Sequence, residues 1–188
     1  MALIYRAELS PSKLEMLQSW VPSPPWAADV DTSALALVGA YRFDDPDGEV
    51  GLEAHLLESA DGRILHVPVT YRNAPLQGFD SAFVTTMQHS VLGERWVYDG
   101  GADPVFLRAF ASTIVSGGVQ ADFDVQTDDG TVPRQLTTFV TGSGGDDNGG
   151  NMSIIRIAGT VDVPKSAARL TGTWPGQQDP AVLAFVEE

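Results

Sequence analysis

Two alternating segments on either side of Asp61-Gly62 commit the chain to an antiparallel hairpin. Apolar and polar residues alternate over 49–59 and again over 64–72, which is the pattern of a half-buried strand. An Asp-Gly pair between two such runs is a strong turn signal, because both positions tolerate a positive φ angle. Pro68 cannot donate a hydrogen bond to a sheet, which indicates that the second strand lies at an edge or contains a bulge.

Two helices are predicted, and both carry recognisable start signals. Ser12 and Glu15 stand at capping-box spacing near the beginning of segment 11–20. An Asp-Pro pair supplies the N-cap and the first helical residue of the second helix, 104–116, and a Gly-Gly pair ends it. The second helix is the longer of the two.

Further strands outnumber the helices. They are predicted at 2–9, 34–43, 82–99 (one or two strands around Gly93), 119–126, 134–142 and 152–163, and the tail 180–188 is expected to dock as a strand or a short helix. The segments 119–126 and 134–142 would form a hairpin around an Asp-Gly turn. Many antiparallel strands around one or two helices predict an α+β fold in a single domain, 1–188. The glycine-rich stretch 142–150 is expected to be a flexible loop.

The composition is that of an acidic chain with an ordinary apolar content. Hydrophobic residues make up 43%, and 25 acidic residues outnumber 11 basic ones, which gives a net charge of −14. Such a surface repels phosphate backbones and anionic lipids, so nucleic-acid and membrane binding are disfavoured. Cysteine is absent, and the sequence has neither a signal-peptide core nor a run of about 20 apolar residues. We therefore expect a cytoplasmic protein.

No complete catalytic or cofactor site is visible in the sequence. His89 and Ser90 are neighbours whose side chains would point to opposite faces of a strand, so they would not form a nucleophile–base pair. His55 and His66 would share the exposed face of the hairpin and could approach each other, but a third metal ligand is lacking. No phosphate-binding glycine motif is present. We expect no catalytic residue, no cofactor and no metal.

The polar stretch 88–100, QHSVLGERWVYDG, is better explained by architecture than by catalysis. Gly93 suits a turn or bulge between two strands. Val91, Trp96 and Tyr98 can pack inward while the Glu-Arg pair between them faces solvent. The closing Asp-Gly pair turns the chain toward the second helix. Each polar residue of the stretch therefore has a structural use.

Six segments of the chain occur in an order and spacing that are specific to one family. They are AxIYxAxLxPSKLExLxxW at 2–20, VPVTYRNAPL at 67–76, HSVLGERWVYDG at 89–100, DPVF at 103–106, LTGTW at 170–174 and LAFV at 183–186. Together they resemble the N-terminal cap domain of maltokinases and related actinobacterial sugar kinases. The resemblance extends over essentially the whole chain.

This resemblance implies both a fold and a limit on function. Caps of this family are cystatin-like, with a curved antiparallel sheet wrapped around one main helix, here with additional strands. In the full-length kinases the cap precedes a two-lobed body that carries the catalytic and ATP-binding residues. The chain ends at Glu188, where that body would begin. The resemblance therefore implies a non-catalytic cap-like module that exists as a stand-alone protein.

Two functions follow as expectations. The first is binding or modulation of a partner protein, such as a sugar kinase or another enzyme of α-glucan or trehalose metabolism. The second is binding of a sugar or sugar phosphate on the concave face of the sheet. The candidate contacts for a ligand or partner are Tyr71, Arg72, His89, Arg95 and Tyr98. The two arginines could instead form surface ion pairs. An enzyme of another type is a third class, for which the sequence holds no residue-level signal.

Overall fold

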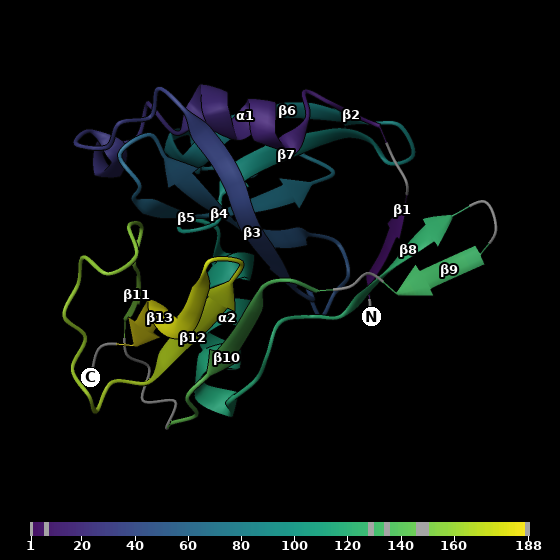
Figure 1. The fold of residues 1–188 in the computed structure, drawn as a ribbon. Helices are drawn as coiled ribbons and strands as arrows, with labels where there is room; N and C mark the ends of the chain where they lie inside the picture. The colour runs from purple at the N-terminus through teal and green to yellow at the C-terminus, as the bar shows by residue number, and fades with distance from the viewer. Residues whose placement is uncertain (1, 6–7, 128–129, 134–135, 146–150, 187–188) are drawn as a thin grey trace.

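The structure of the chain, a computed structural model, describes residues 2–5, 8–127, 130–133, 136–145 and 151–186. Within these ranges the chain forms a six-stranded, a four-stranded and a three-stranded sheet together with two α-helices (Figure 1). The predicted α+β class, with a strongly curved antiparallel sheet and one main helix, is confirmed.

The six-stranded sheet is antiparallel throughout and has the order β2-β6-β7-β5-β4-β3. Its strands are β2 (Leu9–Ser10), β3 (Leu35–Phe43), β4 (Gly51–Ser59), β5 (Ile64–Arg72), β6 (Phe83–His89) and β7 (Gly93–Asp99). The β4–β5 hairpin is the one predicted from the alternating segments. The break predicted at Gly93 is also present, because this residue begins β7 with a φ angle of 75°.

The first helix, α1 (Lys13–Trp20), lies inside the curl of this sheet. Its residues Met16 and Leu17 belong to a core that we call the inner core. The other members from the sheet are Leu35, Leu57, Leu65, Val67, Val69, Met87 and Val97. A helix that shares one core with five neighbouring strands lies on their concave side, which we call the inner face. The predicted capping box is present, with Ser12 as the N-cap and Glu15 as its partner.

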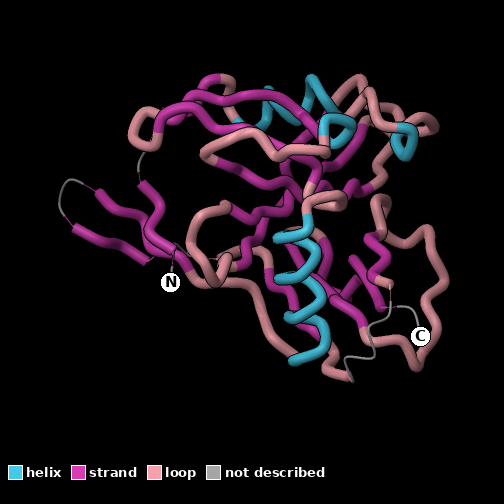
Figure 2. Tube along the Cα trace, turned by 180° about the vertical axis from the view of Figure 1, so that it is seen from behind, coloured by secondary structure: helices cyan, strands magenta, loops and turns pink. Residues whose placement is uncertain are grey.

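The second helix, α2 (Pro104–Ser116), packs against the opposite, outer face together with the four-stranded sheet (Figure 2). That sheet has the order β10-β12-β13-β11, with β10 (Phe139–Gly142), β11 (Met152–Ile154), β12 (Arg169–Trp174) and β13 (Gln177–Val186). The outer core joins these elements; it includes Tyr41, Leu52, Leu56, Phe106, Phe110, Ile114, Val140, Leu170 and Leu183. The helix has the bounds predicted from its Asp-Pro start and Gly-Gly end.

Strands β4 and β5 are buried on both faces, because most apolar residues of β4 lie on one face of the sheet and most apolar residues of β5 lie on the other. Leu56 pairs with His66, and Leu57 pairs with Leu65. The even-numbered residues of both strands therefore face the outer core, and the odd-numbered residues face the inner core. The prediction that His55 and His66 share an exposed face is wrong. His55 is 1% exposed on the inner side, and His66 is fully buried on the outer side.

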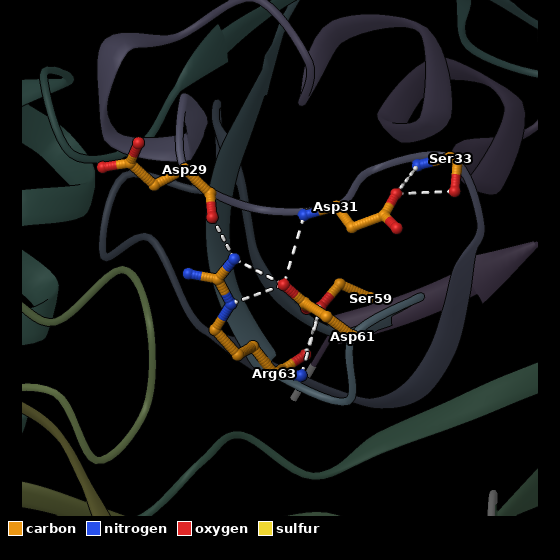
Figure 3. A network of polar contacts seen from close by, with 6 residues as sticks. All are labelled: Asp29, Asp31, Ser33, Ser59, Asp61 and Arg63. Carbon is orange, nitrogen blue, oxygen red and sulfur yellow. Dashed lines mark hydrogen bonds and ion pairs between the residues drawn. The ribbon is translucent and has the colours of Figure 1, made fainter.

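A polar network around Asp61 holds the loop between β4 and β5 (Figure 3). The Asp61 carboxylate accepts hydrogen bonds from Ser59 Oγ at 2.6 Å, from Arg63 Nε at 2.9 Å and from the backbone amide of Asp31 at 3.3 Å. Among the loop residues only Gly62 has a positive φ, at 79°. The connection is therefore a loop with one left-handed glycine, not the two-residue turn with two positive φ angles that the sequence predicted.

Pro68 lies in an interior strand, so the prediction of an edge strand is wrong. β5 is flanked by β4 and β7. The Pro68 carbonyl accepts a hydrogen bond from Gly100, just beyond the end of β7. The amide and the carbonyl of a strand residue point toward the same neighbouring strand. The amide that Pro68 lacks would therefore face β7, at the end of the β5–β7 ladder, which begins with the pair Val69 and Asp99.

The third sheet corrects two further predictions. β8 (Phe123–Thr127) pairs with β9 (Gly130–Pro133) and, in parallel, with β1 (Ala2–Tyr5), so its hairpin partner is not the segment 134–142. This small sheet lies to one side of the two cores (Figure 1). Of the predicted strand 152–163, only the part that forms β11 is a strand.

The glycine-rich stretch 142–150 is described in its first part. Gly144 and Gly145 donate backbone hydrogen bonds to the carbonyls of Ile114 and Val115, at 2.9 and 3.0 Å. These bonds satisfy carbonyls that the last turn of α2 leaves without helical partners. Residues 146–150 lie outside the described residues.

Candidate functional site

The five residues predicted as ligand or partner contacts lie on two faces of the six-stranded sheet. The register pairs Tyr71 with Val97 and Arg95 with Met87, which are both inner-core residues, and His89 follows on the same side. Arg72 pairs with Trp96 and Tyr98 with Thr70, on the outer side. The five side chains therefore do not form one site.

Arg72 and Tyr98 hold neighbouring segments in place. The Arg72 guanidinium donates two hydrogen bonds of 2.7 Å to Asp103, whose carboxylate is fully buried and also caps α2 at Val105. These bonds outweigh burial and lower the pKa of Asp103. The Tyr98 hydroxyl accepts a hydrogen bond from the Leu76 amide at 2.9 Å. Arg72 thus forms an ion pair, as the alternative interpretation allowed, but its partner is buried.

His89 and Arg95 hold the turn between β6 and β7. His89 Nδ1 accepts hydrogen bonds from the amides of Val91 and Leu92, at 3.2 and 3.1 Å, and Arg95 donates to the Leu92 carbonyl at 2.9 Å. The prediction that Val91 packs inward is wrong, because it is 54% exposed, and Leu92 beside it is 49% exposed. Val91 and Leu92 form an exposed apolar pair that we call the hairpin tip. His89 and Arg95 hold the backbone of this pair.

Other polar residues of the stretch 88–100 also have structural partners. Ser90 exchanges hydrogen bonds with the backbone of Glu8, at 3.0 Å in each direction. Asp99 accepts two hydrogen bonds of 2.7 Å from Arg156, which in turn lies over the ring of Trp26 at 5.2 Å. Ser90 and Asp99 therefore have structural roles, as the interpretation of this stretch as architecture expects.

A polar pocket that the sequence interpretation missed lies at the start of α1, on the inner face of β3 and β4. Its volume is about 270 Å³. It is lined by Lys13, Leu37, Val38, Gly39, Ala40, Arg42, Glu53, His55, Leu136 and Thr137. The pairing of β3 with β4 slips between Leu37 and Gly39, and such irregularities commonly occur beside functional sites.

Charged and aromatic side chains meet in this pocket. Lys13 Nζ lies 2.5 Å from Glu53 Oε2, and the ammonium group also lies 5.4 Å from the centroid of the Tyr71 ring. His55 Nε2 lies 3.3 Å from the Tyr71 hydroxyl and 3.7 Å from Glu53 Oε2. Arg42 stands directly opposite Glu53 in the β3–β4 ladder. Tyr71 is thus the one predicted candidate that belongs to this cluster.

The environment of the cluster fixes its protonation states near neutral pH. Burial alone would raise the pKa of Glu53, but the charge of Lys13 and the other nearby cations lower it to about 2. Burial lowers the pKa of His55 to about 4, although the Glu53 charge acts in the opposite direction. Burial also raises the pKa of the Tyr71 hydroxyl well above its usual value. At pH 7 the cluster therefore holds an ionised Glu53 carboxylate and a neutral His55 imidazole.

Two buried atoms of the pocket lining have no hydrogen-bond partner in the described part of the chain. They are His55 Nδ1 and Arg42 Nε. Buried polar atoms are nearly always paired, and an unpaired one costs about 1–3 kcal/mol.

The sequence contained a signal for this site. Most apolar residues of β4 have even numbers and most apolar residues of β5 have odd numbers, so in the paired strands they lie on opposite faces of the hairpin. This arrangement makes both faces of the hairpin buried and places Glu53 and His55 in a core.

No group of three His, Cys, Asp or Glu residues could hold a metal ion within the described ranges. None of the helices that the structure describes is long and apolar enough to cross a membrane.

Comparison with known proteins identifies one family. The family model for the maltokinase N-terminal cap domain matches residues 20–103, which confirms the resemblance inferred from the sequence over this range. The matched range runs from the last residue of α1 to the N-cap of α2 and contains β3, β4, β5, β6 and β7. It includes Arg42, Glu53 and His55 of the pocket. No match was found among curated proteins.

Proposed function

With residues 20–103 forming a maltokinase N-terminal cap domain, we propose that this chain is a non-catalytic cytoplasmic module that binds and modulates a partner protein. The partner class is a sugar kinase or another enzyme of α-glucan or trehalose metabolism. The family match carries the proposal, because the cap is an accessory domain and not the catalytic part of a maltokinase.

The hairpin tip is the contact that we assign to the partner. Val91 and Leu92 are adjacent, exposed and apolar, and burial of apolar side chains by a partner favours association. His89 and Arg95 fix the backbone of this turn through three hydrogen bonds. A turn that is already ordered loses little conformational entropy on binding, which favours affinity.

The test begins with affinity capture by the tagged full chain from cells of its own organism. We expect mass spectrometry to identify a sugar kinase or another α-glucan or trehalose enzyme among the captured proteins. The affinity of the purified enzyme for the chain is then measured by calorimetry. The double variant Val91→Asp/Leu92→Asp should bind at least tenfold more weakly, because two desolvated carboxylates would face an apolar contact.

The control is Val161→Asp, which adds one such charge at another exposed valine, 45% accessible. This variant should bind as the unaltered chain does. Failure to recover any carbohydrate-pathway enzyme under mild conditions would contradict the proposed partner class. Equal losses in the tip and control variants would contradict the assignment of the contact.

The second candidate function, binding of a small ligand such as a sugar or sugar phosphate, is favoured by the polar pocket. Helix α1 occupies much of the concave face of the sheet, so a ligand there would bind beside the start of the helix. The two unpartnered atoms on the pocket lining support this function. None of the residues that line the pocket belongs to the hairpin tip.

A further inference from the structure

The hydrogen-bonding needs of the pocket can be derived atom by atom, beginning with His55. Its Nε2 faces two oxygen atoms, the Tyr71 hydroxyl at 3.3 Å and Glu53 Oε2 at 3.7 Å. The carboxylate can only accept hydrogen bonds. The proton of the neutral imidazole is therefore best placed on Nε2, where it is shared with these oxygens. This tautomer leaves Nδ1 as a buried acceptor without a donor.

Arg42 presents the opposite need. Its guanidinium nitrogens are donors only, and Nε is buried without an acceptor in the described residues. Arg42 and His55 are diagonal neighbours on the same face of the β3–β4 ladder, because Arg42 pairs with Glu53 and Ala40 pairs with His55. One small group between them would have to accept from Arg42 and donate to His55.

The hydroxyl group is the ligand chemistry that meets both needs. A hydroxyl donates one hydrogen bond and accepts two. A phosphate or carboxylate that is fully ionised only accepts, and would place its lone pairs against His55 Nδ1. We propose that the pocket is a binding site for a small neutral polyhydroxy compound, one hydroxyl of which bridges His55 Nδ1 and Arg42 Nε. This inference rests on the second candidate function and not on partner docking.

Size and charge agree with a neutral ligand. A volume of about 270 Å³ lies just below the roughly 300–1,000 Å³ typical of sites for drug-sized molecules, so the pocket suits a compound with one ring. Lys13 is already paired with Glu53 at 2.5 Å, which leaves less positive charge to attract an anion. Leu37 and Val38 on the pocket lining offer apolar surface for the carbon atoms of such a ring.

The experiment is calorimetric titration of the full chain with glucose, myo-inositol, glucose 6-phosphate and inorganic phosphate. We expect the two neutral compounds to bind in the millimolar range and inorganic phosphate to bind more weakly than they do. Nitrogen-15 spectra of the His55 ring should report an acceptor Nδ1 whose resonance shifts when the neutral compound is added. This readout follows the proposed atom directly and does not depend on any activity.

Two substitutions at one position separate the role of Nδ1 from the role of Nε2. His55→Asn keeps a polar atom near the Nδ1 position, whereas His55→Gln keeps one near Nε2 and loses the other. We expect His55→Gln to bind the neutral compound about tenfold more weakly, as the loss of a hydrogen bond predicts, and His55→Asn to bind within about threefold of the unaltered chain. Circular dichroism establishes that both variants are folded.

Each outcome has a defined meaning. Binding of the phosphate-bearing compounds alone, lost on substitution of His55, would overturn the neutral-ligand inference but leave the small-ligand function standing. Absence of binding by all four compounds would overturn both. Equal affinity of the His55→Gln and His55→Asn variants would overturn the role of Nδ1. An unfolded variant is replaced by Arg42→Lys, which keeps the charge and removes Nε, and which should also bind about tenfold more weakly.

Discussion

Two buried histidines on one hairpin carry opposite tautomers. His66 Nδ1 lies 3.2 Å from the Ile155 carbonyl, which can only accept, so the proton belongs on Nδ1. His66 Nε2 then accepts from the Tyr41 hydroxyl at 2.7 Å. His55 has the reverse arrangement, with its proton toward Tyr71 and Glu53. Both side chains are therefore held neutral in the folded state, one in each core.

Acid should destabilise the protein through these two residues. Burial lowers the pKa of His55 to about 4 and that of His66 to about 3, from an ordinary value of 6.5. Below pH 6.5 the unfolded chain binds protons that the folded chain does not. The free energy of unfolding should therefore fall as the pH decreases from 6.5 toward 4, by about 1 kcal/mol per pH unit for each histidine. Above pH 6.5 these groups should contribute no pH dependence.

Urea unfolding between pH 6.5 and 4.5 measures this slope. The variant His66→Gln should lower it by about 1 kcal/mol per pH unit, whatever its effect on stability at pH 7. His89→Gln is the matched control and should change the slope less, because His89 is half-buried and its pKa is lowered to a smaller extent. A His66→Gln slope equal to that of the unaltered chain would contradict a buried neutral His66.

Residues with local roles could be predicted from the sequence, and residues whose roles depend on distant strands could not. The capping positions Ser12 and Asp103 act within a few residues of themselves, so their spacing was sufficient. The bond between Arg72 and Asp103 spans 31 positions and needs the fold. The pocket residues Glu53 and His55 resembled the exposed side of a strand when β4 was considered alone.

At the scale of elements, the same distinction separates correct from incorrect predictions. The helix α2 and the hairpin of β4 and β5 are set by neighbouring residues, and both were predicted. The parallel pair of β1 and β8 joins segments more than 100 residues apart, and no local pattern marks it. The segment 152–163 alternates well enough for a strand, but beyond β11 its pairing is limited to an isolated bridge between Ile157 and Leu65. Whether these segments form strands depends on a neighbouring strand with which they can pair, rather than on the intrinsic strand preference of their residues.

The contact between β10 and α2 depends on a glycine. A Cβ atom at Gly142 would lie 2.1 Å from the Thr113 carbonyl oxygen and 2.8 Å from that of Ile114. Both are backbone atoms of the last turns of α2 and cannot move aside alone. We expect Gly142→Ala to lower the free energy of unfolding by about 3 kcal/mol, at the upper end of the cost of overpacking. Urea unfolding at pH 7 measures the change.

Gly51→Ala is the matched control in another strand. A Cβ there would meet only Tyr71 side-chain atoms at 3.4 Å, an ordinary contact distance. Its effect should stay below about 1 kcal/mol. If Gly142→Ala proved as mild as this control, the close approach of β10 to the end of α2 would not hold in solution.

At the scale of the molecule, β4 and β5 are the structural link between the two cores. Their even-numbered residues belong to the outer core with α2 and the four-stranded sheet, and their odd-numbered residues belong to the inner core with α1. If either core unfolds, β4 and β5 lose the packing on one of their faces, and the same two strands also carry residues of the other core. The two cores should therefore unfold together.

Adjacent leucines on β4 test this coupling, because Leu56 is fully buried in the outer core and Leu57 in the inner core. Each Leu→Ala substitution should lower the free energy of unfolding by about 3 kcal/mol. Hydrogen exchange read by mass spectrometry should then show that Leu57→Ala reduces protection in β12 and β13 as well as in α1, although Leu57 faces away from that sheet. Leu56→Ala should likewise reduce protection in α1. Loss of protection confined to the core that each leucine occupies would mean that the cores unfold independently, and the hairpin would then be a shared boundary without energetic coupling.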